Sequence, residues 1–380
     1  MAKKTALIIM LVAAMTACGE LSFNINPGGG NNTENEGGNG GENNGGGENN
    51  GTENGGTENE GGNNNENESG NENEGGNENE GGGENEGGGE NNGGGTTPET
   101  PTYPAQEGSG ESNGYKLVWQ DLFDGEVLDE SVWTIEVNGN GGGNNESQYY
   151  CRENVSISKE PTSGRSCLTL TARRESYGGK SFTSGRVNSM GKKYFTHGKV
   201  EAYVCLPKTA NGLWPAFWMM GNDYPEVGWP RCGEIDILEM GNAQGISSGT
   251  QETFMNGACH WGFYKNGAYP NYGKHSNAPY SVQDGEFHLF TLVWDETMIR
   301  MYLDLDEYPN VQPYYEMGIE GTDDEWATGL YFHHDHFILF NLAVGGHFTG
   351  IVNNPAGITA LPNEGSEAKM YVDFVKVYQK

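Results

Sequence analysis

Basic side chains are scarce in this sequence of 380 residues, which has 21 Lys and Arg against 53 Asp and Glu and a formal net charge of -32. No Lys or Arg occurs between Lys4 and Lys116. Proteins that bind nucleic acid neutralise its phosphates with clustered basic side chains. The composition therefore argues against a nucleic-acid partner.

Long apolar runs are missing as well. The run at residues 6–14 is too short to span a bilayer as a stable helix, and no later stretch is apolar enough. With Lys3 and Lys4 before it, this run is typical of a secretion signal. Residues 15–18 (MTAC) resemble a lipobox, which predicts a signal peptide at residues 1–17 and a lipid on Cys18. We therefore expect an exported, lipid-anchored protein on a bacterial outer membrane or cell surface; ordinary signal cleavage is the alternative.

Apolar residues are nearly absent from residues 26–110, which repeat Gly, Asn and Glu. Such a segment cannot bury enough apolar surface to offset the entropy of ordering the chain. We predict a disordered linker over residues 18–112 that would hold a folded domain, residues 113–380, away from a membrane. A repeat expansion without a role is the alternative.

A helical period is absent from residues 113–380. Short runs of β-branched and aromatic residues, ended by Gly, Asn, Asp and Pro, predict strands instead. These runs are residues 115–119, 166–172, 198–204, 287–294, 298–304, 337–343 and 369–378. They predict an all-β sandwich of two antiparallel sheets. In the last run, alternation predicts Tyr371, Asp373, Val375 and Val377 on one side.

Cysteine and histidine are few, and their spacing does not indicate a zinc site. Without Cys18 five cysteines remain, so at least one thiol stays free even where disulfides form. We expect Cys232 to be a small buried residue. The histidines at 333, 334 and 336 favour a loop or the start of a strand, with metal binding as the alternative.

Three carboxylates stand close together in the sequence, at Glu234, Asp236 and Glu239, among apolar residues typical of a strand. Alternation places Glu234 and Asp236 on one face and Glu239 on the other. A β-bulge, which adds one residue to a strand, would return Glu239 to the first face. Retaining glycoside hydrolysis uses two carboxyl groups about 5–5.5 Å apart. A solvated acidic cluster on an edge strand is the alternative.

Indole side chains surround this acidic strand in the sequence. Trp214, Trp218 and Trp229 precede it, and His260 and Trp261 follow it. Sugar rings stack their flat C–H faces on aromatic rings, so the pattern indicates a glycan site. The alternatives are a hydrophobic core for the tryptophans and a structural role for His260.

Residues 233–239 (GEIDILE) closely resemble the active-site signature of glycoside hydrolase family 16, in the bulged form of its laminarinase-like members. Further segments resemble the family in the same order along the chain. They are residues 117–125, 143–150, 184–189, 197–202, 212–218, 229–233, 341–346 and 371–378.

The resemblance implies a β-jelly roll with a substrate cleft on a concave sheet, and an endo-β-glucanase acting by double displacement. Glu234 matches the nucleophile, Asp236 the assisting acid and Glu239 the acid/base. Sugar-stacking positions match Trp214, Trp218 and Trp229, and polar contacts match Asn144, Arg186 and His260. From the sequence pattern itself we expect Trp261, with His260, to complete the far wall of the site.

The expected substrate is β-1,3-glucan or mixed-linkage β-1,3-1,4-glucan. A galactan, or glycan binding without turnover, are the alternatives. We expect a monomer that needs no cofactor for its chemistry; Asp373 matches a position that holds structural calcium in many members. Residues 255–261 depart from the family's usual motif, and the loops at residues 221–228 and 262–278 have no match. Such loops shape substrate subsites, so the preferred linkage stays open.

Overall fold

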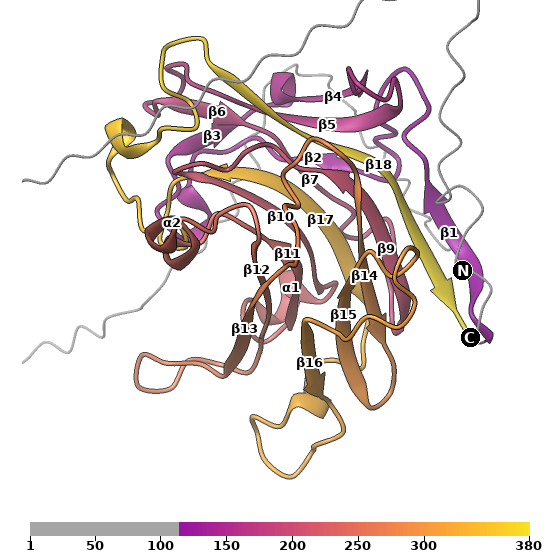
Figure 1. The fold of residues 1–380 in the computed structure, drawn as a ribbon. Coiled ribbons are helices and arrows are strands. Elements are labelled where there is room, and N and C mark those ends of the chain that lie inside the picture. Colours follow the sequence, from indigo (N-terminus) through magenta and orange to yellow (C-terminus); the bar gives the residue numbers. More distant parts are fainter. Residues whose placement is uncertain (1–113) are drawn as a thin grey trace, which may run out of the picture. The chain divides into compact units, whose positions relative to one another are not determined.

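The structure, a computed structural model, describes residues 114–380 (Figure 1). The predicted signal peptide, the lipid on Cys18 and the linker at residues 18–112 lie outside the described residues. Within residues 114–380, every helix is too short or too polar to cross a membrane.

Two large sheets form the described part of the chain, and Figure 1 shows them as curved, stacked layers. The first has ten strands, and its main path runs in the order β16 (Tyr315–Gly318), β15 (Met298–Leu303), β14 (His288–Trp294), β9 (Gly198–Cys205), β18 (Glu367–Gln379), β5 (Ser166–Arg173), β6 (Phe182–Ser184) and β3 (Gln148–Tyr150). In addition, β1 (Lys116–Asp121) pairs with β18, and β4 (Val155–Lys159) pairs with β5.

The second sheet has eight strands among the described residues. Its order is β13 (Asn271–Asn277), β12 (Phe254–His260), β11 (Glu234–Glu239), β10 (Leu213–Gly221), β17 (His336–Val344), β7 (Arg186–Asn188) and β2 (Thr134–Ile135), with β8 (Tyr194–Phe195) beside β17. Short helical turns join the strands: α1 (Tyr224–Val227), α2 (Ala243–Ser248), η3 (Gly141–Gly143), η4 (Arg152–Asn154), η5 (Thr328–Leu330) and η6 (Pro355–Gly357).

The main core is formed by alternate residues of strands from both sheets. In β9, Val200, Ala202 and Val204 are fully buried in it, and β11 contributes Ile235 and Ile237. Burying each of these valine and isoleucine side chains stabilises the fold by about 1.5–3 kcal/mol. All seven strands expected from the sequence are present, so the predicted all-β sandwich is confirmed.

Strand β18 corrects one detail of that prediction. Its pairing with β9 shifts between Val372 and Phe374, which leaves Asp373 as an extra residue. Val375 and Val377 therefore enter the core, while Phe374 packs outside it against Tyr203. The predicted shared face of Asp373 and these valines was wrong, because a bulge reverses the alternation that follows it.

The described cysteines are all unpaired and buried, and Cys232 is fully buried, as predicted. The histidine run lies in a loop and at the start of β17, which confirms that prediction. His333 is hydrogen-bonded to His197, and His334 to the carbonyl oxygen of Cys232.

Candidate active site

Strand β11 contains the predicted bulge. Against β10, Leu238 pairs with Phe217 and Asp236 with Trp218, so Ile237 is the extra residue. The pairing with β12 shifts over the same stretch. Ile237 and Leu238 both enter the core, although neighbouring residues of a regular strand point to opposite faces. The apolar pair thus stabilises the bulge.

The three acids share one face of the second sheet. Glu234 pairs with Met220, Asp236 with Trp218 and Glu239 with Ala216. Paired residues of neighbouring strands project to the same side, and positions 216, 218 and 220 alternate regularly. The bulge therefore brings Glu239 back to the side of Glu234, as the sequence predicted.

Each outer acid accepts a hydrogen bond from an indole. Trp229 Nε1 donates to Glu234 Oε2 at 3.1 Å, and Trp214 Nε1 donates to Glu239 Oε1 at 3.1 Å. Asn256 Nδ2 also donates to Glu239 Oε2 at 2.5 Å. These donors fix the orientation of both carboxyl groups before substrate arrives.

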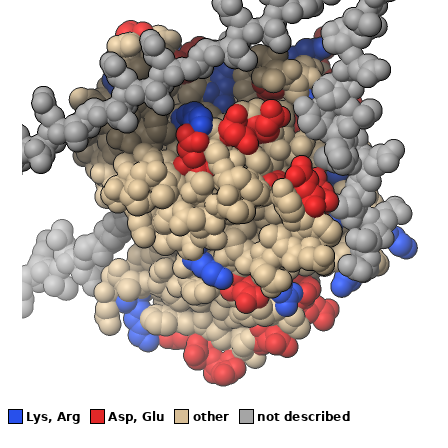
Figure 2. All heavy atoms as spheres, viewed as in Figure 1, with Lys and Arg blue, Asp and Glu red and all other residues tan. Residues whose placement is uncertain are grey.

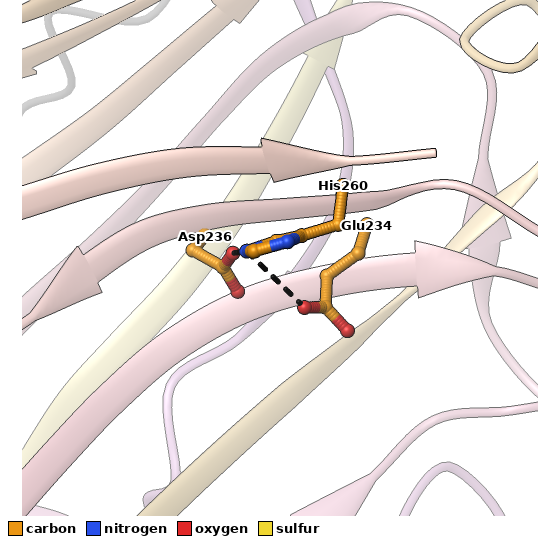
Figure 3. Close-up of side chains that lie close together, drawn as sticks. All are labelled: Glu234, Asp236 and His260. Carbon is orange, nitrogen blue, oxygen red and sulfur yellow. Dashed lines mark ion pairs between the residues drawn. The ribbon is translucent and has the colours of Figure 1, made fainter. Parts of the chain in front are cut away.

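His260 lies beside Asp236 and Glu234 (Figure 3). Its Nε2 is 3.4 Å from Asp236 Oδ2 and 3.9 Å from Glu234 Oε1. It comes from β12, where it pairs directly with Glu234. The predicted polar position of His260 next to the acids is therefore the observed one.

Burial raises the pKa of all three acids, each to about 8. The charge of Asp236 raises the pKa of Glu234 and Glu239 further, while His260 lowers both. Hydrogen bonds from Asn256 and Trp214 also lower the pKa of Glu239. Carboxyl groups that hold protons near neutral pH suit general acid catalysis.

Trp218 and Arg186 lie together on the same face. Trp218 Nε1 donates to Asn341 Oδ1 at 2.7 Å, and the Arg186 guanidinium lies 4.9 Å from the Trp218 ring. Arg186 Nε also donates to Glu136 Oε1 at 2.9 Å. The structure thus places Arg186 near the acids, where its charge lowers the pKa of Glu234.

Asn144 lies at the end of η3, where its Nδ2 donates to the carbonyl oxygen of Gly142 at 3.2 Å. The backbone carbonyl oxygen of Asn144 accepts a hydrogen bond from the backbone N–H of His347. Phe348, the residue after His347, stacks on Trp214 with ring centroids 4.7 Å apart. The loop of Asn144 therefore reaches the acid face through Phe348, without a direct contact between Asn144 and an acid.

Trp261 corrects a sequence expectation. It is 8% exposed, packs against Phe332 at 5.9 Å, and donates from Nε1 to the carbonyl oxygen of Trp326 at 2.7 Å. His260, the last residue of β12, points to the acid face, and Trp261 directly after it points to the core. Trp261 is thus a core residue rather than a sugar-stacking one.

Sequence reasoning missed three residues at the site. Asn256 in β12 pairs with Glu239 in β11. It stands four residues before His260, and this even spacing in a strand, which places both on one face, is the signal that could have found it. Phe348 and Tyr269 come from loops, and Tyr269 lies 4.7 Å from Trp229 by ring centroids. No strand pattern predicts where such loop residues lie.

Two places bear on metal binding. Glu234, Asp236 and His260 offer ligand atoms within 4.8 Å of one another, so these three residues have the spacing of a metal site. Asp373, the predicted calcium position, instead forms an ion pair with Arg165. Calcium prefers several oxygen ligands, and a guanidinium supplies none. The contacts of Asp373 do not fit a calcium ion.

Comparison with known proteins places this site in a family. Residues 144–319 match glycosyl hydrolases family 16. The chain is 31% identical over 268 residues to a β-glucanase of Rhodothermus marinus, covering 70% of this chain and 85% of that one. It is 32% identical over 267 residues to the clotting factor G alpha subunit of Tachypleus tridentatus, covering 70% of this chain but spanning only 34% of the subunit.

A solved structure is similar over the same domain. The mixed-linkage-glucan GH16 of Bacteroides ovatus, in complex with a G4G4G3G product, is 41% identical, with a TM-score of 0.60, covering 69% of this chain and 100% of that one. The fold, the bulged acid strand and these similarities agree: the chain belongs to glycosyl hydrolase family 16.

Proposed function

We propose that this domain is a retaining endo-β-glucanase. The observation that carries the proposal is the bulge in β11, which sets Glu234 and Glu239 on one face with an indole donor on each. Retaining hydrolysis requires two carboxyl groups that reach the same glycosidic bond.

In the first step, the Glu239 carboxyl group donates its proton to the glycosidic oxygen. The Glu234 carboxylate bonds to the anomeric carbon as the bond to the leaving oxygen breaks. In the second step, the Glu239 carboxylate takes a proton from water, whose oxygen attacks the anomeric carbon and releases Glu234. Asp236 lies between them in the strand, where its charge raises the pKa of both and favours the protonated form of Glu239.

The proposed substrate contains β-1,3-linked glucose, as β-1,3-glucan or mixed-linkage β-glucan. Support comes from the similarity to the Rhodothermus β-glucanase and to the Bacteroides structure with its glucan product. Figure 2 shows Lys and Arg singly or in small groups on the face that it draws, together with groups of Asp and Glu. Sizing the products from laminarin, lichenan, barley glucan and agarose would identify the substrate.

The test of the mechanism uses Glu234→Gln and Glu239→Gln, which keep the side-chain shape. We expect both variants to fold and to lose nearly all release of reducing ends, since positioned acid/base catalysis alone contributes about 10²–10⁴-fold. Glu226→Gln, an exposed acid in α1, is the control and should retain activity. Wild-type turnover in either catalytic variant would refute the assignment. Retention of the wild-type protein in a glucan affinity gel without product release would indicate a glycan-binding protein instead.

We also propose that the chain is exported and held at a membrane by a lipid on Cys18. The support is the sequence of residues 1–18, with its basic start, apolar run and MTAC end. Metabolic labelling with a fatty acid tests it: the wild type should be labelled, Cys18→Ser should not, and equal labelling would contradict the proposal.

A further inference from the structure

The loop between β12 and β13, residues 262–270, adds tyrosines to the acid face. The ring of Tyr269 lies 4.7 Å from that of Trp229, and the ring of Tyr264 lies 5.1 Å from Tyr269 and 6.0 Å from Trp229. The three distances are similar, so the rings form a compact triangle in which each ring contacts the other two. We call Trp229, Tyr269 and Tyr264 the aromatic cluster. None of the family motifs in the sequence covers this loop.

One member of the aromatic cluster touches the acid group, and another is open to solvent. Trp229 donates to Glu234, and Tyr269 lies 5.7 Å from the His260 ring. Burial raises the pKa of Tyr269 to about 12, with Glu234 adding to the effect, so its hydroxyl group keeps its proton at neutral pH. Tyr264 is 51% exposed. The aromatic cluster therefore connects the nucleophile position, through Trp229, with solvent at Tyr264.

The loop that carries Tyr264 is anchored on both sides of it. Phe263 packs on Trp326 at 5.7 Å, and the Arg231 guanidinium lies 5.4 Å from the Phe263 ring. Lys265 and Ala268 exchange two backbone hydrogen bonds, at 2.8 and 3.2 Å. An exposed ring on an anchored loop loses little conformational entropy when a ligand binds. The exposure of Tyr264 is thus a fixed feature of the loop.

We propose that Tyr264 is a substrate-binding platform on which a glucose ring of the glucan chain stacks, beyond the glucose bound at Glu234. The proposal rests on the proposed function. Two features carry it: the aromatic cluster is continuous with the acid group through Trp229, and the Tyr264 ring is its exposed member. The neighbouring charge, Lys265, is paired with Glu325 at 3.2 Å, which suits a neutral ligand.

This arrangement makes the contribution of Tyr264 depend on substrate length. A short oligosaccharide that fills only the positions at the acids does not reach Tyr264, whereas a polymer does. Loss of the ring should therefore weaken binding of long substrates and leave the chemical step unchanged. A purely structural role would impair all substrates alike.

The experiment measures kcat and KM of the full chain on barley glucan and on glucan oligosaccharides of increasing length. For Tyr264→Ala we expect KM to rise about three- to tenfold on the polymer and the long oligosaccharides, with kcat unchanged and no effect on the shortest substrate cleaved. Tyr264→Phe keeps the ring and should behave nearly as wild type. Tyr308→Ala removes a similarly exposed tyrosine (48%) that follows β15 in the first sheet, and should change nothing.

The outcomes separate this inference from the proposed function. If the wild-type chain cleaves glucan but Tyr264→Ala loses activity equally at every length, or loses none, the platform is refuted and the glucanase stands. If the wild type cleaves no β-glucan, both proposals fail.

Discussion

Glu239→Gln should stabilise the domain at neutral pH while it abolishes activity. Burial and the charge of Asp236 raise the pKa of Glu239 from 4.5 to about 8. In the unfolded chain the same group ionises near its ordinary value. Between these two pKa values the folded state binds the extra proton, so wild-type stability falls as pH rises. Glutamine is neutral in both states and escapes this loss.

The size of the effect follows from the pH interval. Each pH unit between the two pKa values costs the wild type up to about 1.4 kcal/mol in this group. At pH 7 the limit is therefore about 3 kcal/mol. The substituted glutamine keeps an oxygen for only one of the two donors, Trp214 and Asn256, which reduces the gain. We expect a net gain of about 1–3 kcal/mol at pH 7, or about 2–4 °C in Tm per kcal/mol.

The assay is urea or thermal unfolding of both proteins at pH 4, 5, 6, 7 and 8. The difference in free energy of unfolding should be near zero or slightly negative at pH 4, where Glu239 is largely protonated in both states and only the lost hydrogen bond counts, and it should rise up to about pH 8. Glu201→Gln is the contrasting variant, because that buried carboxylate lies 2.8 Å from Lys199 Nζ. Its loss should destabilise at pH 7, since it removes the partner of a buried cation. A Glu239→Gln difference that stays constant with pH, or is negative at pH 7, would refute the reasoning.

Three further predictions concern the acids, their indole neighbours and the ion pair of Asp373. The pH dependence of kcat/KM should be bell-shaped, because Glu234 must be ionised and Glu239 protonated. The pKa of both groups is raised to about 8, so the basic limb, where Glu239 loses its proton, should lie near pH 8. A basic limb below pH 6 would contradict this. Trp214→Phe removes a donor to ionised Glu239 and should move the basic limb to higher pH, whereas Trp218→Phe, whose indole binds Asn341, should not move it. Calcium chelation should leave Tm unchanged, because Arg165 already pairs with Asp373; a fall in Tm that calcium restores would show that the ion pair opens to admit the metal.

Local sequence was enough to determine the strands of the fold and the identity of the acids. Side-chain alternation has a period of two in any strand, so β9 could be recognised without knowing its partners, and β17 by its run of apolar and aromatic residues. The bulge in β11 was predictable for a related reason. Ile237 and Leu238 are adjacent apolar residues between two acids, and only an added residue lets both enter the core.

The contacts made across the sheets and between loops were decided by the tertiary structure alone. Trp261 faces the core directly after β12 ends at His260, although both looked like substrate contacts in the sequence. Asp373 meets Arg165, which is 208 residues away along the chain, and the loop of Tyr264 meets the indole of Trp229. Such contacts depend on strand order and on how loops pack, and neither leaves a periodic signal in the sequence. Local patterns therefore determined which residues stand in the acid strand, and long-range packing decided what each of them touches.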